Sequence, residues 1–172
     1  MTAGTLNLKI ITPERIVFEA PVKQVTARAV DGELTILPDH EPIVTALAID
    51  VVEFKGESYE DTAAVIGGVM EVKKGEDAIR ERDARNAGKG DKEKEQEDID
   101  PNATYVTIVS NLAELHTEID EARANQAKQR LEAERTQKTD KLEVHLAEMA
   151  LSKAMARLKA VEIVKQRRKG QH

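Results

Sequence analysis

The first side chains that could do chemistry are Asp39, His40 and Glu41, which stand side by side in the stretch GELTILPDHEPIVT. Two carboxylates and an imidazole can bind a metal ion or exchange protons near neutral pH. The run is bounded by Pro38 and Pro42, and a lone histidine in such a turn is more often structural. We therefore interpret these residues as scaffold and expect no metal site here.

The rest of the chain lacks the residue patterns of common catalytic sites. It contains no cysteine, which excludes a disulfide framework, a thiolate zinc site and a cysteine nucleophile. No glycine-rich loop has Walker A spacing, and no serine sits in a nucleophile elbow. The histidines are separated and show no metal-ligand spacing, at His40, His116, His145 and His172. We expect that the chain alone is not an enzyme.

Composition restricts the partners that the chain can bind. Its net charge of −6 argues against non-specific phosphate binding, and its two Phe and two Tyr residues supply little stacking surface for nucleic acid bases. No run of about 18 apolar residues could span a membrane, and the beginning, MTAGTLNLKI, lacks the pattern of a signal peptide. These features predict a cytoplasmic chain that binds no nucleic acid and does not insert into a membrane.

One end of the chain is basic, although the whole is acidic. From Lys153 to His172 there are seven basic residues and one acid, Glu162, so the rest of the chain carries a net charge of −12. This asymmetry favours an acidic partner, although a solvated helix end would show the same charges. We call the seven basic residues the basic tip: Lys153, Arg157, Lys159, Lys165, Arg167, Arg168 and Lys169.

Residues 1 to about 74 have the pattern of short β-strands. Leu6, Leu8 and Ile10 alternate with other positions in a period of two, and turn signals recur about every ten residues. Asp31-Gly32 is a strong hairpin signal because both positions tolerate positive φ. This spacing predicts a sandwich or a barrel.

Residues 76–100 differ from the rest, because sixteen of the twenty-five are charged. Such a segment buries too little apolar surface to offset the entropy lost on ordering. We expect a flexible insertion with a helix near Ala78–Ala87. Strand pattern precedes it at Val69–Lys73 and resumes at Thr104–Val109, which places the insertion inside a β-hairpin.

Residues 117 to about 168 predict two helices joined by a short break. Thr117–Asp120 resembles a capping box for the first helix, and Asp140 is a good N-cap for the second. The expected apolar positions are Ile119, Ala122, Ala127 and Leu131, and then Leu142, Leu146, Met149, Ala150, Ala154, Leu158 and Val161. Alanine on the facing sides predicts a weakly held αα-hairpin that can dock, undock or open.

Several of these motifs, taken in order, resemble those of the epsilon subunit of bacterial F-type ATP synthase. The run Gly32–Pro42 resembles the family signature G-E-L-G-I-L-P-G-H-x-P, with Thr35 and Asp39 in place of two glycines. The other matching runs are Ile11–Glu14, Ile66–Val72 without its usual Phe, Val106–Ile108, Glu118–Ala124 and Ala154–Leu158. The match covers nearly the whole chain apart from residues 76–103.

The resemblance implies an α+β fold, with an N-terminal flattened antiparallel β-sandwich followed by a C-terminal α-helical hairpin. We place the sandwich at residues 1–114, with the charged insertion at about 76–103, and the hairpin at 115–172. In the family the sandwich binds the gamma subunit and stands on the c ring, at the cytoplasmic face of the cell membrane. The implied stalk and c-ring docking residues are Glu33, Leu37, Pro38, Asp39, His40, Glu41 and Pro42.

The resemblance also implies a function without catalysis. The subunit couples proton-driven rotation to ATP synthesis in the alpha/beta catalytic head, and no cofactor is required. The helical hairpin can fold against the sandwich or extend along gamma. When extended, the basic tip can meet an acidic loop of the beta subunit and block ATP hydrolysis.

Some family members bind a regulatory ATP on the folded hairpin through the motif I/L-D-x-x-R-A. The aligned residues here are Glu114, Ile119, Asp120, Arg123, Ala124, Arg130, Lys153 and Arg157. Lys153 stands where ATP-binding members have arginine, and lysine lacks the planar fork that suits phosphate. A simpler interpretation is that Asp120 and Arg123 form only a surface ion pair at a helix start.

Two rival functions stay open from the sequence. The first is a free-standing adaptor module without an ATPase partner, whose charged insertion would recruit another protein. The second is an independent nucleotide-hydrolysing enzyme, although the chain lacks a Walker lysine and an evident magnesium site.

Overall fold

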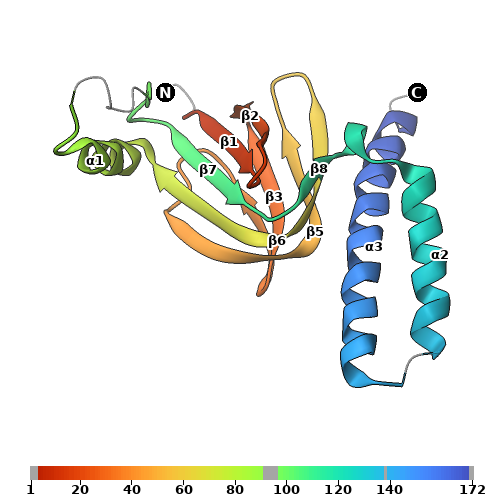
Figure 1. Ribbon diagram of the computed structural model, residues 1–172. Coiled ribbons are helices and arrows are strands. Elements are labelled where there is room, and N and C mark those ends of the chain that lie inside the picture. The colour runs from red at the N-terminus through yellow and green to blue at the C-terminus, as the bar shows by residue number, and fades with distance from the viewer. Residues whose placement is uncertain (1–3, 91–96, 138, 171–172) are drawn as a thin grey trace.

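The computed structural model describes residues 4–90, 97–137 and 139–170, and these form a curved β-sheet with two antiparallel helices standing beside it (Figure 1). The strands are β1 (Leu6–Ile11), β2 (Ile16–Val22), β3 (Gln24–Ala29), β4 (Gly32–Ile36), β5 (Ile43–Lys55), β6 (Glu60–Lys74), β7 (Thr104–Val109) and β8 (Ala113–Leu115). The helices are α1 (Gly75–Asn86), α2 (Glu121–Gln137) and α3 (Lys141–Lys169), with a 3₁₀ turn at His116–Glu118. The predicted α+β class is confirmed.

One continuous sheet makes the N-terminal part. Its strand order is β2-β1-β7-β6-β5-β3-β4, and β8 pairs with β6. The strand pairs are antiparallel except for β1 with β7, which is parallel. The long strands β5 and β6 sweep beneath the others, so the sheet folds over on itself as a flattened sandwich (Figure 1).

The core lies between the two halves of the folded sheet. Leu6, Leu8 and Ile10 on β1 point into it, as their alternation predicts, and each is at most 1% exposed. Phe54 is fully buried and packs against Phe18 with ring centroids 4.3 Å apart. Edge or offset contacts between aromatic rings are favourable at this distance.

The hairpin between β3 and β4 forms one residue earlier than its sequence signal indicates. Ala29 pairs with Gly32, so the two turn residues are Val30 and Asp31 rather than Asp31 and Gly32. Gly32 begins β4 with a φ of 138°, a conformation that side-chain-bearing residues rarely adopt.

Gly68 allows the sheet to close tightly at the middle of β6. It has a φ of 130°, and a Cβ there would lie 2.2 Å from the carbonyl oxygen of Val109 on β7. Only glycine permits this approach of two backbones.

The charged insertion leaves the sheet between β6 and β7, which pair from Val69 with Val109 to Lys74 with Thr104. It opens with α1, which begins at Gly75 and is therefore longer at its start than the helix expected near Ala78–Ala87. The expectation of flexibility over residues 91–96 concerns positions outside the described residues.

The apolar stripes predicted for the two helices are wrong in part, since Ala122, Leu142, Leu146 and Met149 are exposed while the other predicted positions are buried or partly buried. Ala124 is the buried residue of α2, and Leu142, Leu146 and Met149 of α3 are exposed. The buried positions of α3 are Ala147, Leu151, Ala154, Ala156, Ala160 and Val164. Small side chains pack α3 against α2 and the sheet because they let backbones approach closely, whereas the larger side chains lie on the part of α3 that extends beyond the sheet (Figure 1).

Candidate functional site

A hollow of about 380 Å³ lies between the start of α2, the middle of α3 and β8. Its volume falls within the roughly 300–1,000 Å³ of small-molecule sites. The lining residues are Glu114, Glu118, Ile119, Asp120, Arg123, Ala124, Ala127, Ala154 and Arg157. Alanines from both helices leave the space open, and charged side chains from three elements converge on it.

The local structure at the start of α2 sets the rim of this hollow. The expected capping box at Thr117 is wrong, because that residue belongs to a 3₁₀ turn and α2 begins only at Glu121. Asp120 takes the capping role, and its Oδ1 accepts a hydrogen bond from the backbone N–H of Arg123 at 3.0 Å. A carboxylate at this position satisfies an unpaired N–H and favours the positive end of the helix dipole.

The walls of the hollow are joined by an ion pair between sheet and helix. Arg157 of α3 donates from Nε to Oε2 of Glu114 on β8 at 2.5 Å, and both side chains are largely covered. The Arg123 guanidinium is exposed and has no ion-pair partner among the residues that the structure describes. An arginine on each helix therefore faces one space, and only the docked hairpin brings the two together.

Six of the eight residues expected for ATP binding line the hollow, and two do not. The six are Glu114, Ile119, Asp120, Arg123, Ala124 and Arg157. Arg130 lies further along α2, where it pairs with Glu134 at 3.0 Å. Lys153 is half-buried on α3 but does not line this space. The alignment with the family motif, which placed Arg130 in the site, is therefore not matched by the structure.

Glu118 and Arg15 belong to the same site, and the sequence argument missed that role. Glu118 lines the hollow, accepts from the Leu115 N–H at 3.0 Å, and pairs with Arg15 of the β1–β2 connection at 2.5 Å. Arg15 is 103 residues away in sequence, so no local signal indicates this pair. The Arg15 charge offsets one of the three carboxylates around the hollow.

The run Asp39-His40-Glu41 does not form a converging set of ligands. The backbone N–H of Asp39 donates to Thr104 Oγ1 at 2.9 Å, His40 Nδ1 lies 2.7 Å from the Glu41 carbonyl oxygen, and Glu41 pairs with Lys74 at 3.0 Å. Within the described residues no group of three or more His, Asp or Glu side chains could hold a metal ion. Asp39 has a φ of 66°, which explains why glycine suits this position.

The other expected docking residues lie near the start of β4 and in the segment between β4 and β5. Leu37 is about half exposed, and Glu33 and Pro42 are also exposed. Pro38 adjoins Leu37 in the turn that precedes β5.

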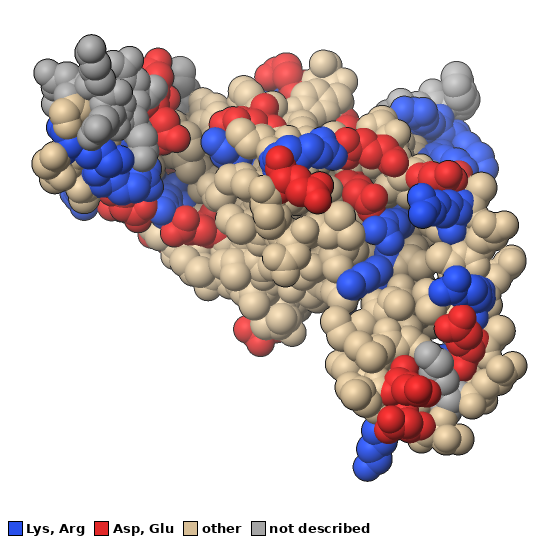
Figure 2. Space-filling model, viewed as in Figure 1, with Lys and Arg blue, Asp and Glu red and all other residues tan. Residues whose placement is uncertain are grey.

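Most of the basic tip faces carboxylates of this same chain. Figure 2 shows lysine and arginine side chains gathered toward the upper end of the helical pair, next to acidic side chains of the sheet. Lys159 pairs with Asp50, Lys165 with Glu121, and Arg167 with both Glu53 and Glu60. Arg168 and Lys169 are exposed at the end of α3.

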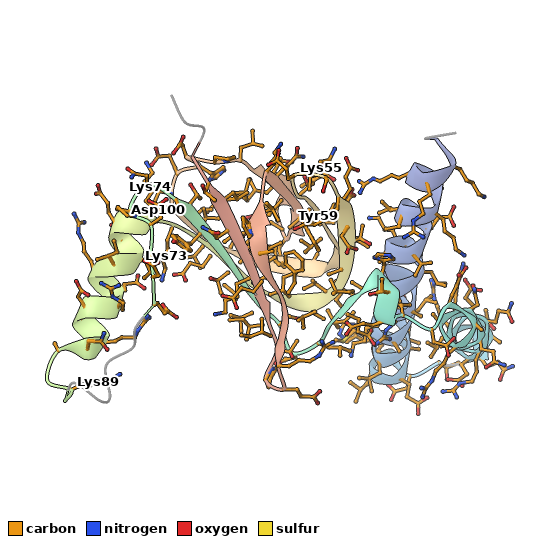
Figure 3. The ribbon with its side chains drawn as sticks, turned by 90° about the horizontal axis from the view of Figure 1, so that it is seen from above. Lys55, Tyr59, Lys73, Lys74, Lys89 and Asp100 are labelled. Carbon is orange, nitrogen blue, oxygen red and sulfur yellow. The ribbon has the colours of Figure 1, made fainter. Side chains whose placement is uncertain are left out.

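A second hollow, of about 840 Å³, lies between the insertion and strands β1, β2 and β7. Figure 3 shows Lys73, Lys74 and Asp100 close together at the base of α1. Lys73 bridges Glu71 and Glu81, and although burial lowers its pKa, the hydrogen bonds to Glu81 and Glu71 raise the pKa of Lys73 overall. The pair between Lys73 and Glu81 holds α1 to the sheet. We therefore interpret the second hollow as the space left between the insertion and the sheet, and not as a ligand site.

Two family models together match most of the chain. The model of the ATP synthase delta/epsilon chain β-sandwich domain matches residues 5–84, and that of the long α-helix domain matches residues 117–162. The ATP synthase epsilon chain of Desulforamulus reducens is 35% identical over 160 residues, which cover 93% of this chain and 99% of the relative. The epsilon chain of Moorella thermoacetica is 36% identical, over 91% of this chain and 96% of the relative.

A solved structure shares the fold. One chain of the Euglena gracilis mitochondrial ATP synthase assembly, OSCP/F1/c-ring, superposes with a TM-score of 0.64 and 22% identity, covering 91% of this chain and 81% of that one. The chain belongs to the delta/epsilon chain family of ATP synthase. It is an epsilon-type subunit of that complex and not a catalytic subunit. None of its described helices is long and apolar enough to cross a membrane.

Proposed function

We propose that this chain is the epsilon subunit of the central stalk in a proton-translocating F-type ATP synthase. It contacts the gamma subunit and the c ring through its sheet and transmits c-ring rotation to the alpha/beta head. The complex places it at the cytoplasmic face of the cell membrane as a peripheral subunit. The nearly full-length match to epsilon chains supports this role.

The docking surface of this proposal is the exposed turn before β5 together with the start of β4. Leu37 and Pro42 offer apolar surface there, and Glu33 and Glu41 offer charge at its border. A small apolar centre with a polar rim is typical of a protein interface. Replacing Leu37 with Asp should reduce co-purification of the chain with the membrane ATPase while leaving its own fold intact.

We also propose that the 380 Å³ hollow binds ATP as a regulatory ligand. The observation that carries this proposal is the convergence of Arg123 and Arg157 from two helices on one space. Guanidinium groups bind phosphate oxygens through paired hydrogen bonds, so the two arginines would hold the phosphates. Glu114 and Asp120 can accept hydrogen bonds from the amino and hydroxyl groups of the nucleoside.

The carboxylates of the hollow limit how the ligand can bind. Three carboxylates line the hollow together with two arginines: Glu114, Glu118 and Asp120, with Arg123 and Arg157. The carboxylates repel the phosphates of ATP and the arginines attract them, so the phosphates must lie nearest the arginines. Arg157 would then share its guanidinium between Glu114 and a phosphate oxygen. This competition predicts modest affinity, which suits a sensor of a ligand that is abundant in cells.

The hollow exists only while α2 and α3 are docked together and against β8, so ATP stabilises the docked hairpin. A ligand that binds one conformation shifts the population toward it. When ATP is scarce, the hairpin opens, and the basic tip reaches an acidic loop of the catalytic subunit and inhibits hydrolysis.

Calorimetric titration of ATP into the full chain tests the sensor. Arg123→Ala should lower ATP affinity at least about tenfold, because a charge-assisted hydrogen bond to phosphate is lost. Arg135→Ala is the matched control, since it removes the same charge from the far end of α2 and should bind ATP normally. Absence of binding by the unmodified chain would overturn ATP sensing and leave the stalk role untouched.

A further inference from the structure

The contact between α3 and the sheet is a small apolar cluster, in which the partly buried Ile49, Ile66 and Ile163 pack around buried residues of both elements. Ala156 and Ala160 face Val51 and Ala64, and one hydrogen bond joins Thr62 Oγ1 to the Ala160 carbonyl oxygen at 2.9 Å. Alanine side chains bury one methyl group each, and burial stabilises in proportion to the area removed from water. The fully buried centre of this contact is therefore small, and the isoleucines around it stay partly exposed.

Charge complementarity adds to this apolar contact. An acidic patch, defined here as Asp50, Glu53 and Glu60, lies on β5 and at the start of β6 where α3 crosses the sheet. Two residues of α3, Lys159 and Arg167, meet it. Lys159 Nζ lies 2.6 Å from Asp50 Oδ1, and Arg167 contacts Glu53 and also lies 3.2 Å, through Nε, from Glu60 Oε2.

The acidic patch is also stable when α3 leaves it. Asp50 is only 14% exposed, but Arg28 of β3, which belongs to the sheet and not to the hairpin, donates to its Oδ2 at 2.9 Å. Glu60 likewise pairs with Lys55 at 3.0 Å on the sheet itself. When α3 undocks, Asp50 and Glu60 therefore keep a cationic partner on the sheet. A buried carboxylate left without a partner would oppose undocking strongly.

We propose that Asp50, Glu53 and Glu60 are an intramolecular decoy for the basic tip. Docked, they neutralise Lys159 and Arg167 and keep these cations from any acidic surface of another subunit. We call the ion pairs of Lys159 and Arg167 with this acidic patch the latch. The decoy role rests on the proposed inhibitory function, whereas the latch is a property of the isolated chain. Because the latch consists of partly solvated ion pairs, ionic strength opens it without any change in ATP.

The latch uses none of the residues that line the nucleotide hollow, so the two controls are separable. ATP acts through Arg123 and Arg157 near β8. Salt acts through the ion pairs that Lys159 and Arg167 of α3 form with carboxylates of β5 and β6. A chain can therefore lose one control and keep the other.

The test measures docking in the full chain by energy transfer between two dyes. The chain has no native cysteine. A double variant with Glu57→Cys in the β5–β6 turn and Lys169→Cys at the end of α3 therefore carries the two dyes at these two positions and nowhere else. Transfer should be high without ATP at about 0.05 M salt, and the ratio of open to docked chains should rise about tenfold at about 0.5 M salt.

Charge-reversal variants identify the latch. Arg167→Glu should open the hairpin at low salt, and Glu53→Lys with Glu60→Gln, added to it, should restore high transfer. Arg168→Glu changes charge by the same amount one residue away and should leave transfer unchanged, because the exposed Arg168 does not face the acidic patch. Urea unfolding of each variant checks that the sheet remains folded.

Two results would overturn the latch: salt-independent transfer, or equal opening by Arg168→Glu and Arg167→Glu. Calorimetry on the same proteins separates this outcome from failure of the proposed function. Normal ATP binding together with salt-independent docking would refute only the proposed latch. Salt-dependent docking without ATP binding removes only the sensor.

Discussion

Glu114 on β8 and Arg157 on α3 form an ion pair at 2.5 Å that is both a wall of the 380 Å³ hollow and a bond between sheet and helix. The two residues are 43 positions apart in sequence. The same guanidinium that would bind phosphate therefore also reports whether the hairpin is docked, which links ligand binding to conformation through one side chain.

Lys153→Arg should change ATP affinity by less than about twofold, because Lys153 does not line the hollow. Arg157→Lys should lower affinity about tenfold, since lysine lacks the fork that binds phosphate through two hydrogen bonds. Calorimetric titration of both variants provides the comparison. A tenfold gain in Lys153→Arg would mean that this side chain reaches the ligand.

Gly68→Ala should destabilise the sheet by about 3 kcal/mol or more, because its Cβ would meet the Val109 carbonyl oxygen in a backbone conformation that favours glycine. Urea unfolding followed by circular dichroism measures the loss. Gly90→Ala is the control, since no atom of the described residues lies within 4 Å of the Cβ it would add, and it should change stability by less than about 0.5 kcal/mol. Equal stability of the two variants would contradict the close approach of β6 and β7.

Deletion of residues 76–100 should leave the sheet folded. The remaining Gly75, Pro101, Asn102 and Ala103 would join Lys74 to Thr104, which already pair across β6 and β7. Four-residue hairpin loops are common, so the unfolding free energy should change by about 1 kcal/mol or less. A broad, non-cooperative urea transition in the deleted protein would show that the insertion is needed for this pairing.

Stability should fall at alkaline pH. Hydrogen bonds to Glu81 and Glu71 outweigh burial and raise the pKa of Lys73 above 10.5, and burial together with Asp61 raises the pKa of Tyr59 above 10.0. Both protonated forms favour the folded state, so this contribution is complete below the unfolded pKa values and is lost as pH rises through the folded ones. Tyr59 lies near Lys55 at the β5–β6 turn, far from Lys73 (Figure 3).

Urea unfolding between about pH 8 and about pH 11 measures this fall, and Tyr59→Phe together with Lys73→Met should flatten it. Lys128→Met is the control, because it removes a lysine of α2 whose partner is Glu132 on the same helix, away from Tyr59 and Lys73. An unchanged alkaline slope in the double variant would assign the fall to other residues.

Sequence by itself determined the local elements and the family of this protein. The alternation of Leu6, Leu8 and Ile10 predicts the inward face of β1, because a strand turns its side chains to opposite faces. Asp140 predicts the start of α3, and its carboxylate does accept from the Leu142 N–H at 3.3 Å. These features depend on neighbours within a few residues, so local chemistry suffices to predict them.

Only the tertiary structure decided which face of α3 docks. Leu142, Leu146 and Met149 suggest an apolar stripe, but they lie beyond the sheet and stay exposed, whereas Ala156 and Ala160 are buried against it. Helical periodicity says which residues share a face, not where another element ends. The position of the sheet beside the helix made that choice.

The partners of the basic residues were likewise fixed only by the fold. Lys159 meets an aspartate 109 positions away, and Arg167 meets Glu53 at a separation of 114. Arg130, expected in the site from the family resemblance, instead pairs with Glu134 one turn along its own helix. A charge carries no directional pattern in sequence, so its partner depends on which carboxylates the folded chain brings within a few ångströms.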